Sequence, residues 1–202
     1  SSNYAGAKET SNGNEIFTDS LTYIQDIIGS QNEDNITGDS TPNKLTGSEG
    51  ADTITGGGDN DVFVLTDLSN WDTITDFETI PQDDRLQFEE LELGFSAAGT
   101  GFSLSSIDGD TNSNAIIGFD DTTTFSFDKP DVASAINPGI TGNGNSYFVI
   151  SDGTDSRVYV WEDFISNSTV DANELEVLCQ LSSFNTTDIA AMDYASNFDI
   201  IN

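Results

Sequence analysis

The sequence predicts a mostly β protein, in which very short repeated strands are followed by an antiparallel β-rich cap and one or two short C-terminal helices. Glycines recur every nine residues, at Gly29, Gly38, Gly47 and Gly56. Residues 89–160 then alternate apolar and polar positions between Gly, Asn and Asp turns, which is typical of antiparallel strands. An apolar pattern with helical spacing follows at residues 174–181.

The charge of the chain limits the kinds of partner it can have. It has 36 acidic and five basic residues, no histidine and a net charge of -31. Such a chain repels nucleic acid and anionic membranes and opposes its own compaction unless cations are bound. It offers no Ser-His or Cys-His nucleophile and no apolar stretch long enough to insert into a membrane, so we expect neither catalysis nor insertion. Carboxylate and carbonyl oxygens remain as the main functional groups.

The repeat has a consistent chemical pattern within each nine-residue unit. The four units are GSQNEDNIT, GDSTPNKLT, GSEGADTIT and GGGDNDVFV, covering residues 29–64. The eighth position is apolar in every unit, which suits a short strand with one buried face. The first six residues form turns, and a turn that exposes carbonyls and ends in Asp presents the oxygen ligands that Ca²⁺ prefers. The sixth position holds Asp34, Asn43, Asp52 and Asp61, and the eighth holds Ile36, Leu45, Ile54 and Phe63.

These units resemble the RTX (repeats-in-toxin, hemolysin-type) nonapeptide G-G-x-G-x-D-x-U-x, a calcium-binding repeat. The resemblance implies a parallel β-roll with two nonapeptides per turn, so that units one and three stack, as do units two and four. It implies one calcium ion between Asp34 and Asp52, and a second between Asn43 and Asp61. The carbonyls implied for the first site are near Ser30, Asn32, Gly47 and Glu49, and those for the second are near Asp39, Thr41, Gly56 and Gly58.

The repeats depart from the family pattern and continue beyond the four units. Asn43 replaces Asp, which predicts a weaker second site because ligand charge tunes Ca²⁺ affinity. Gly50 is the only glycine at position four, where Asn32 is a residue that can adopt positive φ. Upstream, Ile27 occupies the apolar position of a preceding unit in which Gln25 replaces the Asp, which predicts a strand that has no metal site. Downstream, the half-unit recurs in a closing segment in which Asp76 and Asp84 are further candidate ligands. We therefore separate a lead-in of residues 1–28, a roll at 29–88, a cap at 89–160 and a C-terminal part at 161–202.

A second calcium loop is suggested at residues 163–174, which begin with Asp and end with Glu. The EF-hand spacing assigns its ligands to Asp163, Asn167, the carbonyl of Thr169, Asp171 and Glu174. Residues 165 and 168 depart from that scheme, and a β-like segment precedes the loop. The run ELEVLCQL is interpreted as the exiting helix, with Cys179 as a buried core residue. The alternative is that Asp171 only caps a helix. Residues 107–114 are an Asp/Asn-rich loop, either a cation site or a solvated turn.

The C-terminal tail and the function complete these expectations. The tail starts a short helix capped by Thr187 or Asp188 and ends in an acidic residue followed by two isoleucines, which resembles a type I secretion signal. No N-terminal signal peptide is recognisable. We expect an extracellular, monomeric calcium-binding module that folds on binding Ca²⁺ outside the cell and supports the secretion or stability of itself or a larger parent. The alternative is a calcium-dependent module that binds polysaccharide or a cell surface.

Overall fold

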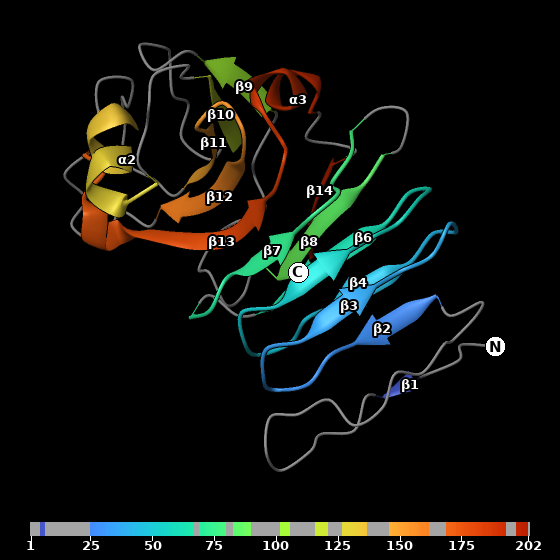
Figure 1. The fold of residues 1–202 in the computed structure, drawn as a ribbon. Coiled ribbons are helices and arrows are strands. Elements are labelled where there is room, and N and C mark those ends of the chain that lie inside the picture. The colour runs from blue at the N-terminus through green and yellow to red at the C-terminus, as the bar shows by residue number, and fades with distance from the viewer. Residues whose placement is uncertain are drawn as a thin grey trace.

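Two β-sheets organise the chain in a computed structural model, which describes residues 5–6, 25–66, 69–79, 83–89, 102–105, 116–120, 127–136, 146–161, 169–192 and 197–201. One sheet has the strand order β1-β2-β4-β6-β8-β14, and the other has the order β3-β5-β7-β13-β12-β11-β10-β9. Figure 1 shows the strands β2 to β8 stacked as one body, with β9–β13, α2 and α3 gathered at its end. The fold is therefore mostly β, as expected.

The stacked strands form the predicted parallel β-roll. They are β2 (Asp26–Ile28), β3 (Asn35–Thr37), β4 (Lys44–Thr46), β5 (Thr53–Thr55), β6 (Val62–Leu65), β7 (Asp72–Ile74) and β8 (Arg85–Glu89). Successive strands alternate between the two sheets, and each pairs in parallel with the strand one turn later. Ile36 pairs with Ile54, and Leu45 pairs with Phe63. Two nonapeptides therefore make one turn.

The apolar eighth position of each repeat faces the space between the two sheets. Leu45, Ile54 and Phe63 are fully buried, and Ile36 at the first turn is nearly so. Strand alternation explains this, because the neighbours of each buried residue point outward. Ile27 packs against the same core, which confirms the strand predicted before the first repeat. That strand also pairs with β1 (Ala5–Gly6).

The cap continues one sheet of the roll. Its strands are β9 (Phe102–Ser105), β10 (Ile116–Asp120), β11 (Ser146–Ser151), β12 (Ser156–Trp161) and β13 (Leu175–Leu181). Strands β11 and β12 are antiparallel, as the alternation predicted, and β13 is antiparallel to β12, whereas β9 and β10 are parallel to β11. Strand β13 also pairs in parallel with β7 of the roll. The sheet thus passes from roll to cap without a break.

The helix predicted for ELEVLCQL is wrong, because this run forms strand β13. Leu175, Val177, Cys179 and Leu181 recur with a period of two, and all are buried. Leu178 is buried as well, which gave the run its helical appearance. The strand lies between β12 and β7 and has apolar clusters on both faces, so packing overrides the local pattern. Cys179 is a buried core residue, as expected.

Short helices and a last strand complete the described residues. They are α2 (Lys129–Ile136), the 3₁₀ helix η2 (Ala172–Glu174), α3 (Thr186–Ala191) and β14 (Phe198–Ile201). Helix α2 lies in the segment expected to form strands. Helix α3 was predicted, but its N-cap is Asn185 and not Thr187 or Asp188. Strand β14 pairs in parallel with β8, which places the C-terminal residues on the roll (Figure 1). Among the described residues, no helix has the length and apolar character of a membrane span.

Candidate metal centre

The repeat loops lie along the two edges of the roll, where the chain crosses between the sheets. Edge I contains loops 29–34 and 47–52 and ends at Asp72, and edge II contains loops 38–43 and 56–61 and ends at the closing segment 75–79 and 83–84. Each loop is followed by a strand that pairs with the strand one turn away. The sixth residues of successive turns therefore lie side by side along each edge.

A ladder of hydrogen bonds joins the sixth positions along edge I. Oδ1 of Asp52 accepts the backbone N–H of Asp34 at 2.7 Å, and Oδ1 of Asp72 accepts the N–H of Asp52 at 3.1 Å. Asp52 and Asp72 are buried. Their carboxylates therefore satisfy backbone donors that the turns would otherwise bury.

Edge II repeats this ladder with one substitution. Oδ1 of Asp61 accepts the N–H of Asn43 at 2.8 Å, and Oδ1 of Asp84 accepts the N–H of Asp61 at 2.9 Å. All three side chains are buried. Within its own loop, Oδ1 of Asn43 accepts the N–H of Asp39 at 2.8 Å, as a carboxylate oxygen of Asp34 accepts the N–H of Ser30 on edge I. The amide of Asn43 thus preserves the hydrogen bond but lacks the charge.

Neighbouring loops of one edge contact each other through side chains on edge I and through the backbone on edge II. On edge I, Oγ of Ser48 donates to the carbonyl of Gly29 at 3.3 Å, and the side chains of Gln31 and Glu49 are joined at 3.1 Å. On edge II, the N–H of Gly58 donates to the carbonyl of Asp39 at 2.9 Å. The candidate carbonyl ligands of each expected pair of loops are therefore brought together on the same edge.

The second-turn loops have a backbone conformation that the first-turn loops lack. Positions two and four have positive φ at Ser48 (82°) and Gly50 (114°) on edge I, and at Gly57 (108°) and Asp59 (72°) on edge II. Glycine is required at Gly50 and Gly57, where a Cβ atom would also meet the backbone of the preceding turn. Position four of the first repeat, expected to favour positive φ, does not adopt it.

Side chains fix the first-turn loops instead. Oγ of Ser30 accepts the N–H of Asn32 at 3.2 Å. Oδ1 of Asp39 accepts the N–H and the hydroxyl of Thr41, at 2.8 and 2.6 Å. These are local turns of the kind that Ser and Asp stabilise. Four of the candidate ligands are thus held in place by contacts within their own loops.

Edge II concentrates negative charge. Burial raises the pKa of Asp61 to about 6, and the nearby charges of Asp76, Asp59 and Asp39 add to the effect. Burial also raises the pKa of Asp84 to about 7, with Asp61 and Asp76 contributing repulsion. The hydrogen bonds of the ladder oppose these shifts but do not cancel them. A cation bound among these groups would relieve the repulsion and favour their ionised forms.

Asp76 stabilises the last loop of edge II through its backbone. Its two carboxylate oxygens accept the N–H groups of Gly56 and Gly57, each at 2.8 Å. The next residue, Phe77, is buried and packs between Phe63 and Phe184, with ring centroids at 6.0 and 5.4 Å. The closing segment therefore fixes the loop with a carboxylate and fills the end of the core with a ring.

The chemistry of these edges fits a hard cation coordinated mainly by backbone oxygen. Within the part of the chain that the structure describes, no three Asp, Glu or Cys side chains converge as a metal-binding group. Each edge instead combines buried carboxylates with loops whose backbones approach each other. Ca²⁺ takes about six to eight oxygen ligands in flexible geometry, including carbonyls and carboxylates together.

The second expected calcium loop is only partly described, because Asp163 and Asn167 lie outside the described residues, as does the loop 107–114. Thr169 is exposed. Asp171 is the N-cap of η2 and forms a capping box with Glu174. Oε2 of the buried Glu174 accepts the indole N–H of Trp161 at 3.1 Å and the N–H of Asp171 at 3.3 Å. The helix-capping alternative for Asp171 agrees with this geometry.

Sequence reasoning did not assign Asp72 to either site, although the structure makes it the last member of the edge I ladder. The signal was present, since Asp72 precedes Thr73 and Ile74 as Asp52 precedes Thr53 and Ile54. Asp72 was not assigned because it lies 20 residues after Asp52, whereas two repeat units span 18. The strand register shows that the two residues are nevertheless equivalent, because Thr53 pairs with Thr73.

Comparison with known proteins agrees with the geometry of the roll. The family model for the RTX calcium-binding nonapeptide repeat (4 copies) matches residues 28–64. No curated protein was found to match the chain. The matched residues contain the four loops and the strands β3 to β6, which wind as two units per turn. Residues 28–64 therefore match the RTX calcium-binding nonapeptide repeat in sequence, and they wind as the parallel β-roll expected of it.

Proposed function

We propose that this chain is a secreted module that completes its folding when Ca²⁺ binds along the two edges of the roll. The observation that carries the proposal is the buried ladder of carboxylates on each edge, which places like charges one turn apart at 1% to 5% side-chain exposure. Burying such charges without a compensating cation is unfavourable. Calcium would supply that compensation.

On edge I, one ion lies between Asp34 and Asp52, with carbonyls from loops 29–34 and 47–52 completing its shell. On edge II, a second ion lies between Asn43 and Asp61, with carbonyls from loops 38–43 and 56–61. The second ion has one carboxylate fewer, and the nearby Asp76 and Asp84 add negative charge at the same edge. Direct ligation by Asp76 competes with its hydrogen bonds to Gly56 and Gly57, so its contribution is mainly to hold the loop.

Calcium availability then links folding to export. Inside a cell, where free Ca²⁺ is scarce, the charge of -31 keeps the chain expanded. Outside, Ca²⁺ that binds only the folded roll contributes its binding free energy to folding. The pairing of β14 with β8 supports this order of events, because a C-terminal signal would be held in the folded sheet. Export machinery can read the tail only before the roll closes.

Far-UV circular dichroism tests the folding step. The metal-free protein in EDTA should show little β structure, and excess Ca²⁺ should restore it, whereas Mg²⁺ at the same concentration should not because it prefers a rigid octahedral shell. Elemental analysis of the refolded protein should find bound calcium. Identical spectra in EDTA and in Ca²⁺ would reject the proposal.

A calcium-dependent polysaccharide-binding module is a second candidate, favoured by the outer face of β3, β5 and β7. The outward residues there are uncharged in spite of the acidity of the chain: Asn35, Thr37, Thr53, Thr55, Thr73 and Thr75. The hydroxyls of Thr55 and Thr75 are 2.7 Å apart. The opposite sheet instead carries Asp26, Lys44 and Arg85 at comparable positions. A flat, uncharged hydroxyl surface suits a neutral glycan.

A glycan array probed with and without Ca²⁺ tests this candidate. Binding in Ca²⁺ should be weakened by Thr53→Glu, which places a charge on the exposed face without entering the core. Thr46→Glu, on the opposite sheet, is the matched control. Absence of binding to any neutral glycan in Ca²⁺ would leave the folding module as the function.

A further inference from the structure

In the described residues, the roll and the cap are joined by one pair of strands, by a shared apolar core and by a cluster of side chains on the outer face of the cap sheet. Residues 179–181 of β13 pair with residues 72–74 of β7, and the N–H of Ser182 donates to the carbonyl of Ile74 at 2.9 Å. The inner face of the cap sheet joins the core of the roll, and its outer face packs against α2 in a separate cluster. Trp71, which immediately precedes β7, packs against that outer cluster.

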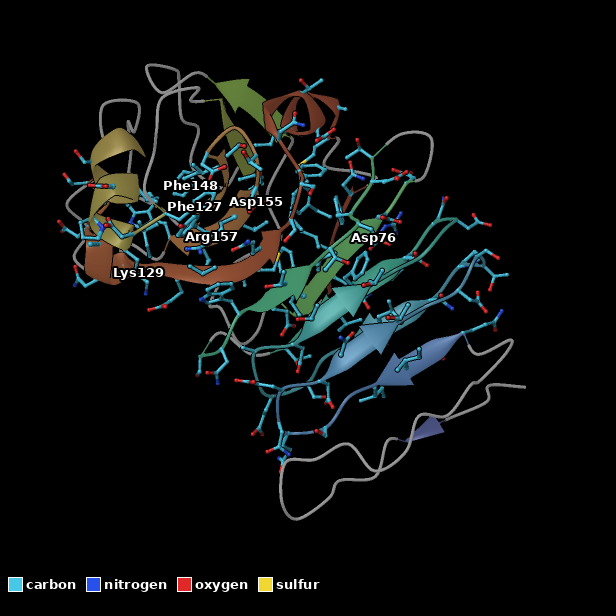
Figure 2. The ribbon with its side chains drawn as sticks, in the orientation of Figure 1. Asp76, Phe127, Lys129, Phe148, Asp155 and Arg157 are labelled. Atoms are coloured by element: carbon cyan, nitrogen blue, oxygen red, sulfur yellow. The ribbon has the colours of Figure 1, made fainter. Side chains whose placement is uncertain are left out.

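Arg157 joins three segments at this outer cluster. It lies on β12, and its guanidinium carbon is 4.6 Å from the ring centroid of Trp71 and 4.6 Å from that of Phe127. Its nitrogen atoms donate to Oε1 of Gln180 at 3.2 Å and to the carbonyl of Phe127 at 3.3 Å. The guanidinium therefore lies between an aromatic ring from the roll and one from the cap. Figure 2 shows Arg157 and Phe127 next to each other in the cap, whereas Asp76 lies on the roll.

The partners of Arg157 are unusual for a chain with seven times as many acids as bases. Its contacts include a neutral amide, a backbone carbonyl, the hydroxyl of Tyr159 and two aromatic faces. A carboxylate partner would be exposed to competition from the Ca²⁺ that the chain binds. Attraction to aromatic faces is not subject to that competition, because Ca²⁺ seeks oxygen ligands.

Trp71 connects this stack to the ladder of edge I. The next residue, Asp72, is buried and accepts the N–H of Asp52, which is itself a proposed calcium ligand. Ordering of edge I therefore fixes the backbone that presents Trp71. A disordered edge I would leave Arg157 with only one of its two rings.

We infer that the stack of Arg157 between Trp71 and Phe127 is a latch that makes folding of the cap follow the calcium-dependent folding of the roll. The inference rests on the proposed function, since Ca²⁺ supplies the order of edge I. Without the latch, the roll still binds Ca²⁺ through its own loops, but the cap sheet loses a connection to it.

Hydrogen exchange resolved by mass spectrometry tests the latch, because it follows the roll (residues 29–64) and the cap (residues 146–161) separately in the full chain during a Ca²⁺ titration. In the wild type, both segments should gain protection at the same Ca²⁺ concentration. In Arg157→Met, which keeps the aliphatic length, the roll should still gain protection with Ca²⁺, whereas the protection factor that the cap reaches in saturating Ca²⁺ should fall about tenfold. In Arg157→Lys, which retains the charge but not the planar fork, the protection of the cap should lie between those of the wild type and Arg157→Met.

Lys129→Met is the matched control, since Lys129 forms a solvent-exposed ion pair with Glu176 at 2.6 Å within the cap. It should leave the protection of both segments as in the wild type. The latch is overturned if the cap of Arg157→Met is protected as strongly as that of the wild type, or if the wild-type cap, but not the roll, is protected in EDTA. If neither wild-type segment responds to Ca²⁺, the proposed function fails instead. In that case, hydrogen exchange in a urea titration tests the latch. Both segments should lose protection at the same urea concentration in the wild type and at different concentrations in Arg157→Met. Loss at the same concentration in both proteins would overturn the latch.

Discussion

The two edges of the roll use the same backbone geometry with different charges. At the first turn, edge I has Asp34 where edge II has Asn43, and each accepts an N–H from its own loop. At the second turn, Asp52 and Asp61 each accept the N–H of the sixth residue one turn earlier. The ladder therefore needs an oxygen acceptor, whereas a metal ion also needs negative charge. On edge II, Asn43 provides the oxygen acceptor, as Asp34 does on edge I, but it carries no negative charge.

Edge II recovers negative charge from the closing segment. Asp84 continues the sixth position of the repeat one turn after Asp61, whereas Asp76 has no counterpart in the nonapeptide pattern and raises the pKa of both Asp61 and Asp84. Asp76 and Asp84 lie at the end of the roll where β8 and Phe77 close the core. On edge II, the proposed ligands Asn43 and Asp61 thus come from the repeats, whereas additional negative charge comes from the segment that ends the roll.

Truncating a ladder residue should have the largest effect. Asp61→Ala removes the acceptor of the buried N–H of Asn43 together with a proposed ligand, so the free energy of unfolding in Ca²⁺ should fall by about 3 kcal/mol, measured by urea denaturation. Asp61→Asn keeps the oxygen and should lose only the calcium-dependent part. Equal losses for both variants in Ca²⁺ would show that the oxygen acceptor of the ladder contributes nothing. Asp52→Ala and Asp52→Asn repeat the comparison on edge I.

The pH dependence of the metal-free protein should come next. The pKa values of Asp61 and Asp84, about 6 and about 7, lie above the value of about 3.9 in an unfolded chain. The folded state then holds more protons, so the small folded fraction that remains in EDTA should fall as pH rises from about 4 to about 7. Saturating Ca²⁺ should remove or reverse this trend by displacing the protons.

Far-UV circular dichroism across that pH range, with EDTA and with Ca²⁺, measures the folded fraction. Asp84→Asn is the informative variant, because it removes the carboxyl whose pKa is raised most. It should flatten the curve in EDTA. A wild-type curve in EDTA that rises with pH would contradict the electrostatic description of edge II.

Exchanging the charges of the two edges should give a smaller, reciprocal effect. Asn43→Asp makes edge II resemble edge I, and its calcium affinity should rise about tenfold, or by about 1.4 kcal/mol. Asp34→Asn should weaken edge I by a similar factor. Calorimetric titration of both single variants and the double variant measures this. Affinities that change in the same direction in both single variants would contradict the assignment of one ion to each edge.

Backbone strain should distinguish the edges least. Ser48 on edge I holds a φ of 82° and Asp59 on edge II holds one of 72°. Ser48→Gly should stabilise the protein by up to about 1 kcal/mol, because Gly adopts positive φ freely. The gain should be smaller for Asp59→Gly, since Asp tolerates this region better. Thermal denaturation in Ca²⁺ measures both, and a loss of stability in Ser48→Gly would mean that its hydrogen bond to Gly29 outweighs the strain.

The roll could be predicted from the sequence because equivalent residues of successive repeats occupy equivalent places in the fold. Ile54 and Phe63 face the same core, and one period explains both. The ladder partners follow from that period as well, since Asp34 and Asp52 are separated by two units. The 20-residue step to Asp72 and the role of Asp76 as a cap for Gly56 and Gly57 depend on irregular loop lengths, which no repeat encodes.

The cap was less predictable because its contacts are non-local. Strand β13 lies between β12 and β7, and β7 is about 100 residues earlier in the chain. Nothing near Leu178 in sequence distinguishes a buried strand from an amphipathic helix. Likewise, the sequence did not indicate that Glu174 accepts the indole N–H of Trp161.

Protection of the ladder amides tests the central claim most directly, because those N–H groups are held only when the two edges are ordered. Hydrogen exchange measured by NMR should show the amides of Asp34, Asn43, Asp52 and Asp61 protected in Ca²⁺ and exchanging rapidly in EDTA. Equal protection of these four amides under both conditions would contradict the claim that calcium binding at the edges folds the roll.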